Sequence, residues 1–218
     1  MSNIRAGKYG VYFGSYFEES EPLTAAEMFV NAGYICDALT SSGWTLEAIA
    51  GLLGNLEHES SINPGRWQSD EVGNLDAGYS LVQWTPSRNY LLWCVDEGKN
   101  DPSEMDTALD RILYELENNI QYYATPDYPL TFREFTQSKG SAYDLACAFA
   151  WNYERSHTVL YGTEEEKEAL RQKRGGSALI WHAYLEGRDP PDPGGKTKKR
   201  RKKYNFVLFG KKPWRNTV

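Results

Sequence analysis

Apolar residues recur at three- and four-residue intervals along most of the chain, and this spacing predicts amphipathic helices. One such stripe consists of Leu46, Ile49, Leu53 and Leu56. Residues typical of helix N-termini stand before these stripes, and three of them form a capping box with a glutamate three positions later. The expected helices begin near Thr24, Thr45, Thr85-Pro86, Asp101-Pro102, Thr131, Ser141 and Thr163, and the last ends near Gly187.

The segments between these helices contain little strand signal. Residues 61–83 are rich in Asn, Gly, Ser and Asp and predict a loop or a small hairpin. Residues 21–187 contain no strand alternation of any length. We therefore expect a mainly α fold, in which one helical domain at 21–187 has a small loop or hairpin region, follows an N-terminal segment at 1–20, and carries a short C-terminal extension.

The C-terminal part of the chain differs in charge from the rest. Residues 196–218 hold ten Lys or Arg and no acid, whereas the other 195 residues hold 14 basic and all 30 acidic residues, a net charge of −16. We interpret residues 188–203 as a Pro/Gly and basic linker, and residues 204–218 as a β-prone anchor. The basic run could be a solvated linker, dock on an acidic partner or nucleic acid, or be a nuclear localisation signal.

The cysteines, histidines and apolar runs give no sign of a disulfide framework, a metal site or a membrane span. Cysteines that are odd in number and widely spaced predict buried free thiols, here Cys36, Cys94 and Cys147. The histidines lack the spacing of a metal motif, and they are His58, His157 and His182. The N-terminus lacks the apolar stretch of a secretory signal. No run approaches the roughly 18 apolar residues of a membrane span. We expect no metal, no cofactor and no contact with a membrane.

Three segments contain candidate chemistry: GNLEHESSINPG (54–65), GYSLVQWT (78–85) and AFAWNYER (148–155). In the first, Glu59 ends an apolar helix and lies about 20° from Leu52 on the helical wheel, at the edge of the buried stripe. Desolvation there would raise the pKa of its carboxyl, as a general acid near neutral pH requires. Glu57 lies nearer the centre of the stripe, so helix geometry alone does not choose between these two glutamates.

These segments resemble the phage tail lysozyme family, within the wider lysozyme and lytic transglycosylase group. The match falls on Glu59-Ser60, on Asn63-Pro64 and on the stretch from Gly78 to Thr85, and the resemblance covers roughly residues 21–187. It implies a lysozyme-like fold with Glu59 as the catalytic acid. FAWNYER resembles a third, weaker family segment whose aromatic residue and glutamate close the cleft. The chain departs from the family pattern at Ser80, where Gly is common, and at Ser156, where Pro often follows.

A hydrolase of this kind also needs a second carboxylate, as nucleophile or as base for water. The candidates on the facing loop are Asp70 and Asp76, with Glu71 beside them, and each could equally be a solvated loop acid. A lytic transglycosylase needs no second carboxylate, because a hydroxyl of the sugar attacks. The residues expected to hold or stack on the glycan are Ser60, Trp67, Tyr79, Gln83, Trp84 and Tyr153. We expect Trp84 to be partly exposed in a groove shared with Glu59.

The expected function is a peptidoglycan-degrading glycosidase of a phage virion that acts at the bacterial cell wall. The alternatives are a lytic transglycosylase on the same glycan and a catalytically inert adaptor of the phage tail. The expected partners are peptidoglycan glycan strands and, through residues 196–218, other virion proteins. Nucleic acid binding by the basic run is not favoured.

Overall fold

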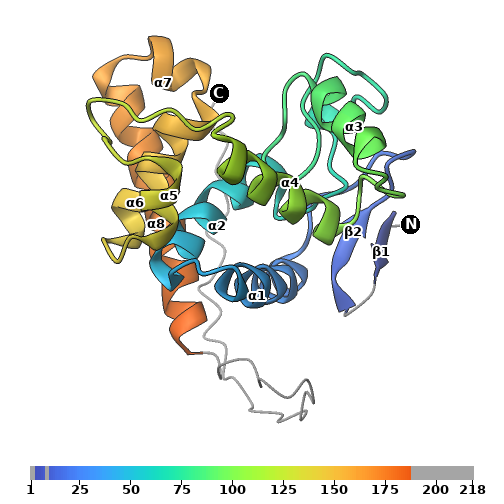
Figure 1. The fold of residues 1–218 in the computed structure, drawn as a ribbon, viewed down its shortest axis with the longest axis horizontal. Coiled ribbons are helices and arrows are strands. Elements are labelled where there is room, and N and C mark those ends of the chain that lie inside the picture. The colour runs from blue at the N-terminus through green and yellow to red at the C-terminus, as the bar shows by residue number, and fades with distance from the viewer. Residues whose placement is uncertain (1–2, 8–9, 188–218) are drawn as a thin grey trace, which may run out of the picture. The chain divides into compact units, whose positions relative to one another are not determined.

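The computed structural model describes residues 3–7 and 10–187, and within them the fold is mainly α, as predicted. The linker and anchor expected at 188–203 and 204–218 lie outside the described residues. In Figure 1 helices α5 to α8 lie to the left, strands β1 and β2 and helix α3 to the right, and α2 and α4 between them. The helices are α1 (Ala25–Ser41), α2 (Leu46–Ser60), α3 (Ser87–Asp96), α4 (Met105–Asn118), α5 (Phe132–Gln137), α6 (Ala142–Phe149), α7 (His157–Tyr161) and α8 (Glu164–Glu186).

Local capping accounts for most of the helix starts. Thr24, Thr131 and Thr163 each form a complete capping box with the glutamate three residues later. At the start of α2 the Thr45 hydroxyl accepts a hydrogen bond from the backbone N–H of Ala48, at 3.2 Å. Each cap supplies a partner for a backbone N–H that the helix itself leaves unpaired. The predicted starts of α1, α2, α5 and α8 are therefore confirmed.

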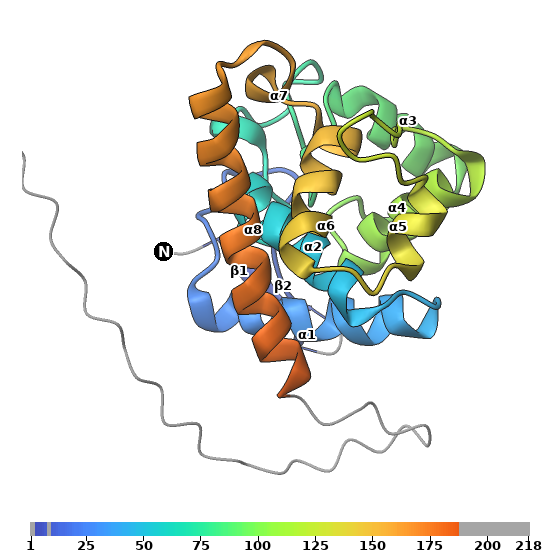
Figure 2. The ribbon, with the colours of Figure 1, turned by 90° about the vertical axis from the view of Figure 1, so that its left-hand side faces the viewer.

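Helix α2 is the buried centre of the fold. It packs against α6 and α8, and most of its side chains from Ala48 to Leu56 are buried. Figure 2 shows α8 running beside α6, with α2 behind them. Gly54 permits this arrangement, because a Cβ at its position would lie 2.6 Å from the Arg174 backbone oxygen of α8. The close contact brings the side chain of Arg174 to the C-terminal end of α2.

Helix α4 starts later than the sequence predicts. The expected start was Asp101-Pro102, but the helix begins at Met105. The Asp101 carboxylate accepts hydrogen bonds from the N–H of Ser103, at 2.8 Å, and from its hydroxyl, at 2.5 Å. The Asp101 side chain therefore stabilises a short turn over residues 101–103, and the helix begins after this turn.

Residues 1–20 contribute a small hairpin that the hydrophobic pattern does not reveal. Strands β1 (Ile4–Ala6) and β2 (Tyr12–Gly14) pair antiparallel, and three residues are too few to show an alternation. The hairpin is fixed to the helical body by Asn31 of α1. The Asn31 amide accepts from the Tyr12 N–H at 2.8 Å and donates to the backbone oxygens of Tyr12 and Ile62. The described part of residues 1–20 thus packs on the helical body.

All three cysteines are buried, as predicted: Cys36, Cys94 and Cys147. No helix among the described residues is long and apolar enough to span a membrane. Within residues 3–7 and 10–187, no three His, Cys, Asp or Glu side chains gather where they could hold a metal ion.

Candidate active site

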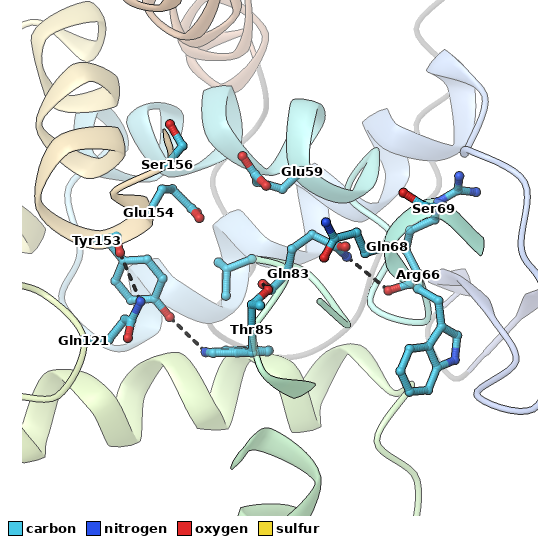
Figure 3. A pocket seen from close by; sticks show the side chains of 13 residues that line it. Glu59, Arg66, Gln68, Ser69, Gln83, Thr85, Gln121, Tyr153, Glu154 and Ser156 are labelled. Carbon is cyan, nitrogen blue, oxygen red and sulfur yellow. Dashed lines mark hydrogen bonds between the residues drawn. The ribbon is translucent and has the colours of Figure 1, made fainter. Parts of the chain in front are cut away.

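The three segments singled out in the sequence meet around one pocket of about 410 Å³. Its lining is mostly polar, with Glu59 on one wall and Glu154 on the next (Figure 3). The lining residues are Glu59, residues 66–69, residues 82–85, Gln121, Tyr153, Glu154 and Ser156. They come from the end of α2, the irregular segment after it, the segment after α4, and the turn after α6. The pocket therefore brings several polar groups beside aromatic rings, as ligand sites commonly do.

Glu59 occupies the last turn of α2, and its side chain is one-fifth exposed. The chain turns sharply just after it, because Ser61 and Ile62 both adopt left-handed backbone angles, with φ of 56° and 55°. The Glu59 carboxylate forms an ion pair with the Arg174 guanidinium of α8. Arg174 also donates a hydrogen bond to the Asn55 backbone oxygen of α2, at 2.8 Å. Arg174 therefore fixes the position of Glu59 at the pocket wall.

Gln83 reaches the pocket through a strained turn. Its own φ is 52° and that of Ser80 is 72°, both in the left-handed region. The Gln83 amide donates to the backbone oxygens of Arg66, at 3.1 Å, and Ser80, at 2.8 Å. The positive φ explains why Gly is common in the family where this chain has Ser80, because glycine adopts that angle without steric cost.

Tyr153 and Glu154 are positioned by a single π-helical turn, η3 (Ala150–Glu154), which continues α6. The turn is closed by a hydrogen bond from the Arg155 N–H to the Ala150 oxygen, at 2.9 Å. Turns of this type inside helices are frequent at functional sites. Here the turn directs two consecutive side chains into the pocket.

The Glu154 carboxyl is in an unusual environment. Among the described residues, its buried Oε1 atom has no hydrogen-bond partner. Burial raises the pKa of Glu154 well above its ordinary value, the charge of Glu59 raises it further, and the Arg174 guanidinium opposes both. Glu154 lies in one of the three candidate segments but is not among the site residues predicted from the sequence. The family resemblance of FAWNYER was the signal that could have identified it.

A buried polar cluster supports the aromatic part of the lining. The Glu115 carboxylate of α4 accepts hydrogen bonds from Trp84 Nε1 at 3.0 Å, from Arg111 Nε at 2.8 Å and from the Tyr153 hydroxyl. Burial raises the pKa of Glu115, and these donors and the Arg111 charge counteract it. Glu115 is not among the residues predicted from the sequence, because the hydrophobic pattern does not distinguish it from Glu117 of the same helix.

The aromatic residues predicted to bind glycan are more buried than expected. The expected partial exposure of Trp84 is wrong: Trp84 is only 6% exposed and stacks on Tyr90 with ring centroids 4.4 Å apart. Trp67, Trp84 and Tyr153 do line the pocket. Tyr79 does not, and its fully buried ring packs on Trp67 instead. These aromatic rings are therefore mainly part of the hydrophobic core, and little of their surface is exposed to the pocket.

Ser60, expected to hold the substrate or orient Glu59, is buried and does not line the pocket. Its hydroxyl donates to the Leu81 backbone oxygen at 2.8 Å. Ser60 therefore ties the end of α2 to the segment that contains Gln83.

The structure does not place the acids of the facing loop in the pocket. Asp70 is ion-paired with Arg66, with 3.2 Å between their charged atoms, and Asp76 is ion-paired with Arg88. Neither lines the pocket, so the structure does not bring either of them together with Glu59 there. Each of these carboxylates instead pairs with an arginine near it in the fold.

Glu71 and Glu57 are also outside the pocket lining. Glu71 accepts a hydrogen bond from the Asn74 amide at 2.5 Å. Glu57 accepts one from Trp181 Nε1 of α8 at 2.8 Å. Of the two glutamates that helix geometry could not separate, only Glu59 faces the pocket.

Comparison with known proteins agrees with this arrangement. The chain is 41% identical over 174 residues to "Morphogenesis protein 1" of Bacillus phage B103; the match covers 79% of this chain and 44% of the relative. The chain therefore spans less than half the length of that relative. The family model described as "Phage tail lysozyme" matches residues 30–185, well over half of the chain and all three segments around the pocket. This protein belongs to the phage tail lysozyme family.

Proposed function

We propose that this protein is a glycosidase that cleaves the glycan of bacterial peptidoglycan, with Glu59 as the general acid. The observation that carries the proposal is the position of Glu59. It ends α2 in a polar pocket where the three family segments meet, and it is one-fifth exposed. Breaking a glycosidic bond requires a carboxylic acid that protonates the leaving oxygen. Gln83 and Tyr153 line the same pocket and could orient the sugar there.

The ion pair with Arg174 bears on how Glu59 can act as an acid. Only the ionised form of Glu59 makes that pair. Glu59 must therefore receive a proton before it can act as an acid. Arg174 would hold the carboxylate in place between turnovers and, being a permanent cation, cannot supply the proton itself.

We further propose that the protein acts as part of a phage particle, at the bacterial cell wall. The family assignment and the phage relative support a phage-associated lysozyme-like protein. Residues 196–218 would attach it to other virion proteins by their charge and their β-prone stretch. The name of the relative describes morphogenesis, which favours a second candidate function, a structural role in the particle without catalysis.

A zymogram on purified cell wall tests the proposal. Glu59→Gln keeps the shape of the side chain but cannot donate a proton from a carboxyl, so cleavage should fall by at least about 10²-fold. The matched control is Glu57→Gln on the same helix, which should lose far less activity because Glu57 lies outside the pocket. Equal loss in both variants, or loss in Glu57→Gln alone, would contradict the assignment of Glu59.

The products separate the two enzyme classes. A hydrolase leaves reducing ends and a lytic transglycosylase leaves anhydro ends, which mass spectrometry distinguishes. An inactive native protein would instead support the structural role.

A further inference from the structure

The pocket contains two carboxyl groups that approach it from separate elements. Glu59 comes from the last turn of α2 and Glu154 from the π-helical turn after α6, 95 positions later in the chain. Figure 3 shows the two carboxyl groups turned toward one another across one side of the pocket. The described structure has no hydrogen bond between them. Both groups line the same pocket, so a sugar oxygen or a water in that pocket can reach either carboxyl.

The charged groups around Glu154 leave it without a cation of its own. Both terminal nitrogens of Arg174 are engaged, one by Glu59 and the other by the Asn55 backbone oxygen. The neighbouring Arg155 guanidinium lies over the Tyr123 ring, 4.5 Å from its centroid. The other charges that act on Glu154 are the carboxylates of Glu59 and Glu115, and both raise its pKa. An ionised Glu154 would therefore be a half-buried charge, with no hydrogen bond to its buried Oε1 atom and no ion pair among the described residues, which is disfavoured.

A buried carboxyl oxygen without a partner calls for an explanation. A purely structural carboxyl would be expected to have its hydrogen bonds satisfied, as Glu115 does with three donors. Glu154 lines the pocket with Glu59, and its unpartnered atom is at the same site. A group that bears a proton in the resting protein and loses it during a reaction would have this arrangement.

We propose that Glu154 is the second catalytic carboxyl of this enzyme, and that Glu59 and Glu154 together hold one proton through the reaction cycle. The proposal rests on the proposed glycosidase function. Glu154 would then be the second carboxylate for which Asp70 and Asp76 were the candidates predicted from the sequence.

The cycle balances in protons. In the resting protein Glu154 is protonated and Glu59 is the carboxylate paired with Arg174. When the glycan is bound, the proton passes to Glu59, directly or through a water or hydroxyl between the two groups. Glu59 then gives it to the glycosidic oxygen as the bond from that oxygen to the anomeric carbon breaks.

Glu154 is now a carboxylate facing a positively charged anomeric carbon. It accepts a proton from a water molecule while the water oxygen bonds to that carbon. One water is consumed, the two sugar products each end in a hydroxyl, and the pair returns to its starting state with the proton on Glu154.

Chemical rescue of the variants tests this assignment on a soluble peptidoglycan oligomer. Glu154→Gln should lower turnover by at least about 10²-fold, with oligomer binding preserved and no loss of melting temperature. In Glu154→Ala, added azide should restore turnover and yield a glycosyl azide, because the small anion takes the place of the missing carboxylate. Azide should not rescue Glu59→Ala, which lacks the acid. Glu57→Gln serves as the control variant.

Each other outcome has a definite meaning. Near-native turnover of Glu154→Gln would overturn the proposal, because the neutral side chain would then suffice. Azide rescue of Glu59→Ala in place of Glu154→Ala would overturn it by reversing the two roles. A native protein that does not cleave the oligomer would refute the proposed function and this inference with it, whereas a cleaving native protein with a fully active Glu154→Gln refutes the inference alone.

Discussion

Replacing Glu154 with glutamine removes one titratable proton from the pocket while keeping the size of the side chain. Burial and the charge of Glu59 raise the pKa of Glu154 above its ordinary value of 4.5 in the folded protein. Above pH 4.5 the unfolded chain has released this proton while the folded chain still holds it. The stability contributed by protonated Glu154 is therefore fully present below pH 4.5 and is lost as the pH rises through the raised pKa.

The size of the effect follows from the number of protons. A difference of one bound proton lowers the free energy of unfolding by up to about 1.4 kcal/mol per pH unit. For a chain of this size, 1 kcal/mol corresponds to roughly 2–4 °C in melting temperature. Glu154→Gln cannot ionise, so its melting temperature should rise relative to that of the native protein by about 3–5 °C for each pH unit between 4.5 and the raised pKa.

The assay is thermal unfolding of both proteins followed by circular dichroism at intervals from pH 4 to pH 8. All other carboxylates titrate in both proteins, so the difference between the two curves isolates Glu154. Glu57→Gln, which loses a carboxylate outside the pocket, is the control for removing a negative charge from α2. Parallel curves for the native protein and Glu154→Gln would mean that Glu154 is ionised in the folded state, and would refute the reasoning.

Three further predictions concern other parts of the chain. Ser80→Gly should raise the free energy of unfolding by about 1 kcal/mol, measured in urea, because glycine adopts the φ of 72° without steric cost; a loss of stability would show that the Ser80 side chain matters more than its backbone angle. Trp84→Ala should lower the free energy of unfolding by about 3–5 kcal/mol, since it empties a buried site next to Tyr90. A variant that unfolds like the native protein but binds glycan weakly would show that Trp84 contacts the glycan and does not stabilise the core. Deletion of residues 196–218 should leave cleavage of short soluble glycans unchanged and abolish incorporation into the particle; salt-dependent loss of activity on whole walls alone would show that the basic run binds the wall instead.

The helices and one wall of the pocket were predictable because the forces that set them act over a few residues. Capping boxes at Thr24, Thr131 and Thr163 join groups three positions apart, and apolar stripes follow from the helical repeat. Glu59 could be placed at the end of a helix for the same reason. The family motifs then separated it from Glu57, which helix geometry could not do, and the packing of α8 agrees, because Trp181 binds Glu57 outside the pocket.

The rest of the site was decided by contacts between distant segments. Asp70 follows Glu59 by only 11 positions, yet Arg66 holds it outside the pocket lining. Glu154 is 95 positions away and shares the pocket, because α6 packs on α2 and a π-helical turn redirects the chain after it. The charge balance of the site likewise depends on Arg174, which reaches Glu59 only because Gly54 lets α8 lie close to α2. Hydrophobic periodicity reports which face of a helix is buried, but it does not report which other segment covers that face. For this reason the sequence could place the first acid on its helix, and only the tertiary structure brought the second carboxyl beside it.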